Sequence, residues 1–192
     1  MTVAGCTAVV AIIREATLYV ANAGDSRCVL CRDGAALAMS RDHKPNDPEE
    51  YARIRNAGGF VSDGRVNGCL NLSRALGDIE YKKTPNLKPE EFMITANPDV
   101  RSIDLQGADQ FLILACDGIW DVLSDQEACD FVLSRLQKKR SLKSIAAELC
   151  DFCLSDDAEG SGEGCDNMTA VIISLSTCRG DSDSESHSSS SQ

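Results

Sequence analysis

Short apolar runs rich in β-branched residues open the chain and predict strands. Thr7 to Arg14 and Thr17 to Ala23 are separated only by Glu15-Ala16, which is typical of a hairpin. Two shorter runs follow, Arg27 to Cys31 and Ala35 to Met39, and each comes after a turn sequence that contains glycine. We expect these four strands to form an antiparallel meander.

Two capping sequences predict where helices begin. Asp47-Pro48-Glu49-Glu50 offers an N-cap, a proline at the first helical position and a capping-box glutamate, so a helix should run to about Asn56. Ser124-Asp125-Gln126-Glu127 is a second capping box, and apolar residues recur at helical spacing after it. A further helix is expected from Ser141.

Three more apolar runs predict strands at Val100 to Leu105, Phe111 to Cys116 and Asn167 to Leu175. Between Phe60 and Pro98 the periodicity is broken by Asp-Gly, Asn-Gly and proline, which is typical of a functional or mobile segment. Strands and helices occur in blocks and do not alternate regularly. The pattern therefore predicts an α+β fold.

Carboxylates stand at the ends of several predicted strands. Asp117 directly follows a buried strand and is separated from Asp121 by one tight turn, while Asp166 directly precedes the last strand. If these two strands pair antiparallel, the three side chains meet at one rim of a sheet. Asp25 lies in the turn between the second and third strands, and so also at a rim. Clusters of oxygen ligands of this kind select hard cations such as Mg²⁺ or Mn²⁺.

The same aspartates also have an ordinary structural interpretation, because aspartate is common in turns for its own backbone hydrogen bonds. Taken singly, each is more typical of a turn than of a ligand set. Asp117 and Asp121 are the exception. Two carboxylates packed between an apolar strand and Trp120 would repel one another unless a cation or a proton compensated.

Length and charge narrow the class of protein. The chain has 192 residues, about the size of one domain, and a net charge of −11, which disfavours nucleic acid and anionic lipid as direct ligands. No apolar run reaches the roughly 20 residues of a membrane span, and no signal-like segment opens the chain. We expect an intracellular protein, cytoplasmic or nuclear, that does not insert into membranes.

Ten cysteines raise the question of zinc, since Cys28 with Cys31 and Cys150 with Cys153 have C-x-x-C spacing. The first pair lies in a predicted strand, where an offset of three residues places side chains on opposite faces. The second pair lies in a helical pattern. Buried, reduced thiols are the interpretation we favour.

Five short motifs follow one another along the chain: Ala23-Gly24-Asp25-Ser26-Arg27, Asp42-His43-Lys44-Pro45, Leu72-Ser73-Arg74-Ala75-Leu76-Gly77-Asp78, Asp117-Gly118-Ile119-Trp120-Asp121 and Asp166-Asn167-Met168-Thr169. In this order they resemble those of the metal-dependent serine/threonine phosphatases of type 2C. The wording of Gly64 to Gly68 and of Gly164 to Thr169 is most similar to the gamma branch of that family, whose catalytic domain is interrupted by an acidic insert.

The resemblance implies two stacked antiparallel β-sheets flanked by α-helices. It covers residues 1–176, which would correspond to the C-terminal portion of the catalytic domain, with the N-terminal portion missing. Residues 177–192 are rich in serine and acidic side chains and lack apolar anchors, so we expect a disordered tail there.

The resemblance also implies a binuclear Mg²⁺ or Mn²⁺ centre that activates a water to attack phosphoserine or phosphothreonine in proteins. Asp117 and Asp166 would ligate the metal core, and Asp25 and Asp121 would help to hold a third, weaker cation beside Asp117. His43 is expected to be a loop histidine and not the catalytic acid.

Some expected parts of such a site are absent from the sequence. No Asp-Gly-His segment occurs, so the isolated chain should be weak or inactive and should need the upstream half of its own catalytic domain as a partner. Arg74 is expected to pair with Asp78 or a neighbouring carboxylate and not to bind substrate. The alternative is a non-catalytic phosphatase-like module used for binding or regulation.

Overall fold

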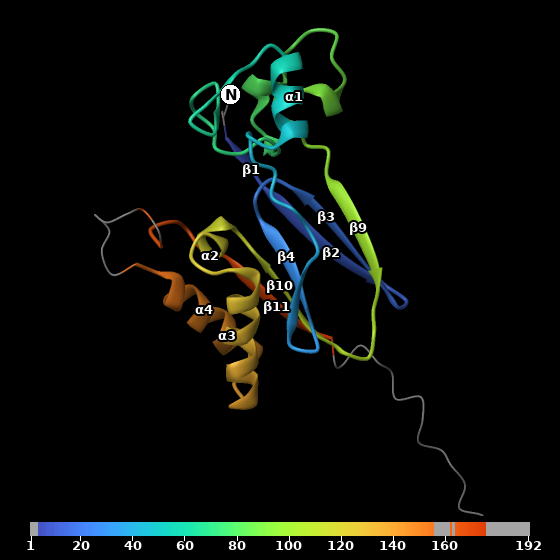
Figure 1. The fold of residues 1–192 in the computed structure, drawn as a ribbon, viewed down its shortest axis with the longest axis vertical. Helices are drawn as coiled ribbons and strands as arrows, with labels where there is room; N and C mark the ends of the chain where they lie inside the picture. The colour runs from blue at the N-terminus through green and yellow to red at the C-terminus, as the bar shows by residue number, and fades with distance from the viewer. Residues whose placement is uncertain (1–3, 156–161, 163, 176–192) are drawn as a thin grey trace, which may run out of the picture.

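The computed structural model describes residues 4–155, 162 and 164–175, so the predicted tail at 177–192 lies outside the described residues. Two lobes are visible in Figure 1: a β-sandwich lobe that carries the helices α3 and α4, and a smaller lobe built around α1. We call the smaller one the cap lobe and define it as residues 44–97. Its own small core contains Ile54, Val66, Ala75 and Ile94.

The sandwich lobe consists of two antiparallel sheets. One has the strand order β11-β10-β4-β5. Its strands are β4 (Arg27–Arg32), β5 (Ala35–Ala38), β10 (Asp109–Ala115) and β11 (Ala170–Ser174). The other has the order β2-β3-β9. Its strands are β2 (Ala8–Arg14), β3 (Thr17–Ala23) and β9 (Asp99–Asp104).

The predicted meander of the first four strands is wrong. The hairpins β2-β3 and β4-β5 form as expected, but β3 pairs onward with β9 and β4 pairs onward with β10. Between them the chain crosses from one sheet to the other at Gly24, whose φ of +118° favours glycine. The crossing lets Val20 and Leu30 meet in one core between the sheets.

A second core lies between the β10 sheet and the helices α3 (Asp125–Gln137) and α4 (Leu142–Cys153), which cover one face of that sheet in Figure 1. Cys31 faces this core, whereas Cys28 faces the core between the sheets. The predicted opposite orientation of these two thiols is therefore confirmed. No helix of the described ranges is both long and apolar enough to cross a bilayer.

The predicted capping box forms at the start of α3 but not at the start of α1. Ser124 caps α3, and Glu127 completes the capping box. The helix α1 (Pro48–Asn56) ends where predicted, but the Asp47 side chain makes no capping hydrogen bond. Glu50 turns into the protein interior instead of back toward the helix start, because Arg53 and the buried Arg74 compete for its carboxylate.

Short elements fill the remaining segments. The predicted turn after Phe111 to Cys116 is a one-turn helix, α2 (Asp117–Trp120). The other short elements are β1 (Gly5–Cys6), β6 (Val61–Ser62), β7 (Arg65–Val66), β8 (Leu76–Gly77), η1 (Ile79–Lys82) and η2 (Pro89–Glu91). The pairing of β1 with β8 fastens the start of the described chain to the cap lobe.

Candidate metal centre

The ends of β10 and β11 bring two of the predicted ligands to one rim. The strands pair antiparallel up to Ala115 opposite Ala170, and the ladder continues when the Cys116 N–H donates to the carbonyl of Thr169 over 3.2 Å. Asp117 is the next residue on one side, and Asp166 lies just before the other strand. The predicted pairing of these strands is confirmed.

Gly118 allows the Asp166 loop to lie directly against α2. A Cβ at this position would stand only 2.7 Å from the carbonyl oxygen of Asn167, so any larger residue would push the loop away. Cys116 adds to the contact, because its Sγ accepts a hydrogen bond from the Thr169 N–H at 3.1 Å. Glycine is therefore required after Asp117 for a steric reason, because only glycine lets the Asp166 loop pack against α2.

Asp25 reaches the same region from the crossing between the sheets. The residue is only 2% exposed, and its Oδ2 accepts a hydrogen bond from Lys44 Nζ at 2.7 Å. Burial lowers the pKa of Lys44, but the bond to Asp25 and nearby negative charges outweigh that effect and raise it. Lys44 therefore remains a cation beside the aspartates.

Mutual repulsion marks the four aspartates as one electrostatic group. Burial raises the pKa of Asp117, and the charges of Asp25, Asp166 and Asp121 raise it further. Burial also raises the pKa of Asp121, while Lys44 opposes that shift. A bound divalent cation would relieve this repulsion, and oxygen ligands suit Mg²⁺ or Mn²⁺.

The described residues do not complete a metal site by themselves. Within residues 4–155, 162 and 164–175, no three histidine, cysteine, aspartate or glutamate side chains are grouped closely enough to hold one ion. The charges of Asp25, Asp121 and Asp166 are thus near enough to raise the pKa of Asp117, yet the four residues form only part of a coordination shell. The donor set fits a divalent cation that takes further ligands from other residues or from water.

Comparisons with known proteins identify the chain's relatives. The family model described as Protein phosphatase 2C matches residues 2–162. The chain belongs to the protein phosphatase 2C family. Human Protein phosphatase 1G is 56% identical over 176 residues, which cover 88% of this chain and 32% of that protein. The rice Probable protein phosphatase 2C 11 is 53% identical over 169 residues, which cover 88% of this chain and 46% of the rice protein.

Solved structures agree with this family assignment. A phosphatase from Toxoplasma gondii superposes with a TM-score of 0.72 at 37% identity, covering 82% of this chain and 47% of that one. A sex determining protein of C. elegans gives the same TM-score at 30% identity, and the match covers 88% of this chain and 40% of the C. elegans chain. The α+β sandwich predicted from the sequence is confirmed. The chain spans about a third to a half of the length of these relatives.

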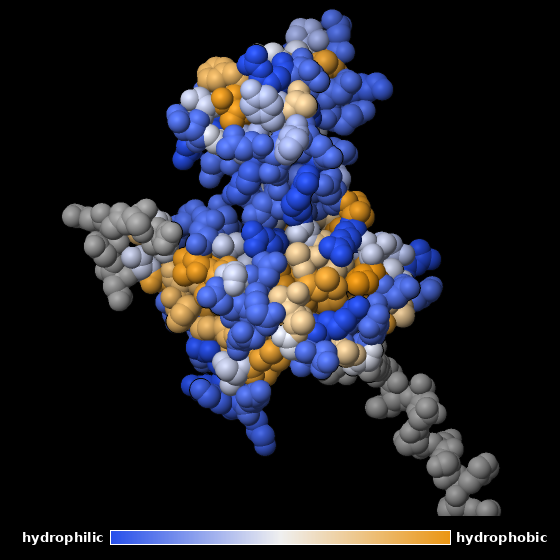
Figure 2. Space-filling view, in the orientation of Figure 1, coloured by the Kyte–Doolittle hydropathy of each residue, from blue (hydrophilic) through white to orange (hydrophobic). Residues whose placement is uncertain are grey.

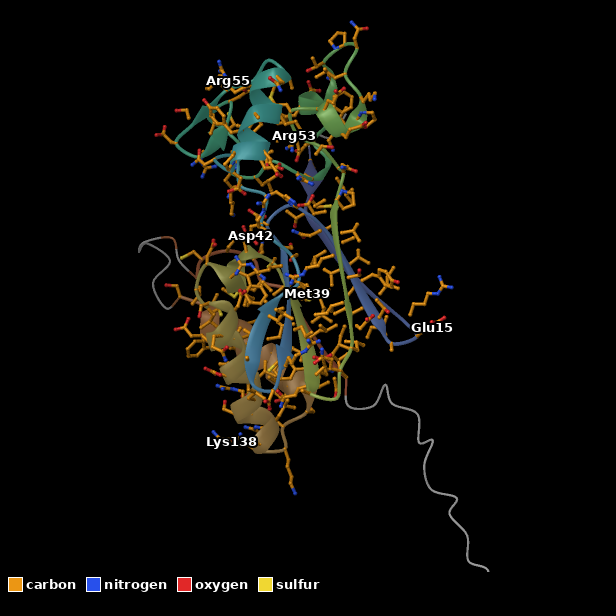
Figure 3. The ribbon with its side chains drawn as sticks, turned by 45° about the vertical axis from the view of Figure 1, so that its right-hand side comes forward. Glu15, Met39, Asp42, Arg53, Arg55 and Lys138 are labelled. Carbon is orange, nitrogen blue, oxygen red and sulfur yellow. The ribbon has the colours of Figure 1, made fainter. Side chains whose placement is uncertain are left out.

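A cleft of about 960 Å³, lined by both charged and apolar residues, opens at the junction of the two lobes, beside the candidate metal centre. Arg27, Asp42, Lys44 and Arg101 are among the residues that line it, whereas Asp117, Asp121 and Asp166 are not. Figure 3 places Asp42 at this junction, and Figure 2 shows the junction to be mostly hydrophilic.

Arg27 lines the cleft and also contacts the short helix α2. Its guanidinium pairs with Asp42 at 2.8 Å and with Asp125 at 2.6 Å, and it lies 5.2 Å from the centroid of the Trp120 ring. Both ion pairs raise the pKa of Arg27 despite its partial burial. The contact holds the end of α2 against the start of α3.

Sequence reasoning missed several polar residues behind the site. Arg74 pairs with carboxylates as expected, but these are Glu50 and Asp99 and not Asp78. His43 lies in a loop as expected, but its full burial was not foreseen. Lys44 was also missed as a partner of Asp25. The one available signal was the position of His43 and Lys44 in a motif of the family, because the His43–Gly24 and Lys44–Asp25 contacts each join residues 19 positions apart.

Proposed function

We propose that this chain is the C-terminal part of the catalytic domain of a metal-dependent protein serine/threonine phosphatase. The observation that carries the proposal is the convergence of Asp25, Asp117, Asp121 and Asp166, whose charges act on one another, in a chain of the protein phosphatase 2C family. The substrates would be phosphoserine and phosphothreonine in intracellular proteins.

Different aspartates would ligate different cations. Asp117 and Asp166 would ligate two Mg²⁺ or Mn²⁺ ions together with residues outside this chain, and Asp25 and Asp121 would hold a weaker third ion beside Asp117. Bound divalent ions supply positive charge for the phosphoryl oxygens and lower the pKa of an attacking water.

The chain's other residues act by holding these carboxylates in place. Gly118 allows close approach of the Asp166 loop, and Lys44 fixes Asp25 through a direct hydrogen bond. Lys44 also offsets negative charge that would otherwise accumulate when no metal is bound. Lys44 is among the residues that line the cleft, and its positive charge would help to attract a phosphate to this region.

A phosphatase assay with a defined phosphopeptide and Mn²⁺ tests the proposal. Turnover should depend on Mn²⁺, and Asp117→Asn should reduce it by about a hundredfold or more, since even residues one contact removed from a metal contribute tenfold to a hundredfold. Glu15→Gln, at the hairpin tip far from the rim in Figure 3, is the matched control and should leave turnover unchanged. Metal-independent turnover would contradict the proposal.

The isolated chain should turn over slowly, because the described residues supply only part of the ligand shell. Supplying the upstream half of the domain, in the same polypeptide, should raise the rate. Equal and full rates with and without that half would contradict the proposed division of the site.

A non-catalytic phosphatase-like module is the second candidate, favoured by the absence of a three-ligand group among the described residues. Isothermal titration with Mn²⁺ separates the two. A phosphatase fragment should release or absorb heat on binding Mn²⁺, and Asp117→Ala should abolish the signal. No heat at millimolar Mn²⁺ would favour the binding module.

A further inference from the structure

A buried polar network joins the cap lobe to the turn that carries Asp25. Its members are drawn from four separate segments of the chain, and most are almost fully buried. They are Gly24, His43, Glu50, Ser73, Arg74 and Asp99. Buried polar groups of this kind are costly unless each finds a partner, so the network specifies one arrangement of the two lobes.

His43 contacts Gly24, the residue before Asp25, through both its backbone and its ring. The His43 N–H donates to the Gly24 carbonyl at 3.1 Å. The ring Nδ1 lies 3.1 Å from the N of Gly24 and 3.1 Å from its O. On the other side of the ring, Nε2 lies 3.2 Å from Oδ2 of Asp99, although off the line of a good hydrogen bond.

These distances favour the tautomer that carries its proton on Nε2. Nδ1 then accepts the Gly24 N–H, and the Nε2 proton faces the Asp99 carboxylate. The opposite tautomer would leave the Gly24 N–H without this acceptor and would place a lone pair against a carboxylate. The Gly24 carbonyl is already satisfied by the Asn22 side chain at 3.0 Å.

Asp99 continues the network into the cap lobe. Its Oδ1 accepts a hydrogen bond from Arg74 at 2.7 Å, and Arg74 in turn donates to Glu50 at 2.7 and 3.0 Å. Burial raises the pKa of Asp99, but the contacts with His43 and Arg74 outweigh it and lower the pKa overall. The path from Glu50 of α1 to Gly24 thus consists of hydrogen bonds, except at the 3.2 Å contact between Asp99 and Nε2 of His43.

We propose that His43 is a positioning residue: its Nδ1 holds the Gly24 N–H, fixes the crossing turn that presents Asp25, and couples that turn through Asp99 and Arg74 to the cap lobe. The proposal rests on the proposed function only for its metal readout. The turn requires glycine at this position, because Gly24 has a φ of +118° and a Cβ there would stand 2.4 Å from Thr7. A glycine backbone is the least restrained by its own side chain, so the hydrogen bond to His43 has a conformation to fix.

Two matched variants distinguish the contact of Nδ1 with Gly24 from the contact of Nε2 with Asp99. His43→Asn places an acceptor near the position of Nδ1 and loses the contact with Asp99, whereas His43→Gln keeps a polar group near Nε2 and loses the acceptor for Gly24. Both remove the ring and leave a similar loss of packing. A purely structural role predicts equal effects, and a positioning role does not.

The first readout is hydrogen exchange of the Gly24 amide in the full, metal-free chain. It should be faster in His43→Gln by about tenfold, the expected effect of leaving one buried donor without a partner. In His43→Asn the exchange should stay within about threefold of the wild type. Equal acceleration in both variants, or in neither, would overturn the proposal.

The second readout is Mn²⁺ affinity by isothermal titration. The affinity should fall about tenfold in His43→Gln and be largely retained in His43→Asn, because only the first frees the turn of Asp25. If wild-type chain binds no Mn²⁺ but the exchange pattern appears, the proposed function fails and the positioning role stands. Mn²⁺ binding with unchanged Gly24 exchange in His43→Gln overturns the positioning role alone.

Asp99→Asn provides a test that keeps the buried His43 ring in the protein and changes only the partner of its Nε2 and of Arg74, at a side chain that is 53% exposed. The variant should speed hydrogen exchange of the Gly24 amide, because it weakens the electrostatic attraction between the Asp99 carboxylate and the Nε2 proton of His43. The effect should be smaller than in His43→Gln, which removes the acceptor of the Gly24 N–H itself. Asp104→Asn, at the other end of the same strand, is the matched control and should have no effect. Identical exchange in the wild type and Asp99→Asn would contradict the coupling through Asp99.

Discussion

Glu50 shows how strongly one buried residue depends on its partners. Its carboxylate has no exposure to solvent and accepts hydrogen bonds from Arg53 and Ser73 at one oxygen and from Arg74 at the other. Burial raises its pKa, but these contacts together lower it from 4.5 to about 2. The residue that the sequence presented as a helix cap is thus an anchor of the cap lobe.

Removal of the Glu50 charge should destabilise the protein in a pH-dependent way. Because the folded pKa lies below the usual value, the stabilisation is complete above about pH 5 and is lost as the pH falls toward 2, amounting to about 3 kcal/mol at neutral pH. Urea unfolding of Glu50→Gln should therefore show a large deficit at pH 7 that shrinks toward pH 3.

Glu49→Gln is the matched control for this charge removal, since the Glu49 side chain is 76% exposed and only 3.6 Å from Arg41. It should change stability little at any pH. A deficit of Glu50→Gln that stayed constant from pH 7 to pH 3 would argue against the lowered pKa of Glu50.

At the scale of elements, local signals predicted structure wherever the contacts were local. The Ser124 capping box depends on residues three apart and was read correctly, and so was the hairpin joining β2 to β3. The supposed meander failed because the choice between β3-β4 and β3-β9 pairing depends on residues some 80 positions apart. No turn sequence encodes that choice by itself.

The cap of α3 should have a measurable share in stability. Ser124→Ala removes a side chain that accepts the Glu127 N–H, and we expect a loss of about 1 kcal/mol in the free energy of unfolding. Ser134→Ala, inside the same helix, is the control and should cost little, since alanine favours helix interiors. Equal losses in the two variants would show that the cap has no special role.

Gly118→Ala tests the close approach of α2 to the Asp166 loop. The added Cβ would meet the Asn167 carbonyl at 2.7 Å, so the loop must move, and both stability and Mn²⁺ affinity should fall. Val132→Ala, in the core under α3, should lose comparable stability without moving the loop. Unchanged Mn²⁺ affinity in Gly118→Ala would contradict the link between this contact and the metal site.

At the scale of the whole molecule, the sequence predicted the class of fold correctly. The assignment of the four aspartates as metal ligands stays a prediction, and the residues that support them could not be predicted. Asp117 and Asp166 could be placed together because they flank two strands whose pairing the pattern suggested. The supports of Asp25 could not, since Lys44 bonds Asp25 and His43 bonds Gly24 from a loop 19 residues further along the chain, outside any strand or helix. Only the folded chain reveals that one buried network joins the cap lobe to the turn that carries Asp25.

The central claim is that Asp25, Asp117, Asp121 and Asp166 form one wall of a divalent-cation site. Anomalous diffraction from crystals grown with Mn²⁺ tests it most directly. A manganese peak should lie about 2.0 to 2.6 Å from a carboxylate oxygen of Asp117. The peak should vanish in Asp117→Asn crystals grown under the same conditions. A map without manganese at this rim in wild-type crystals at saturating Mn²⁺, or a peak that survives Asp117→Asn, would contradict the claim.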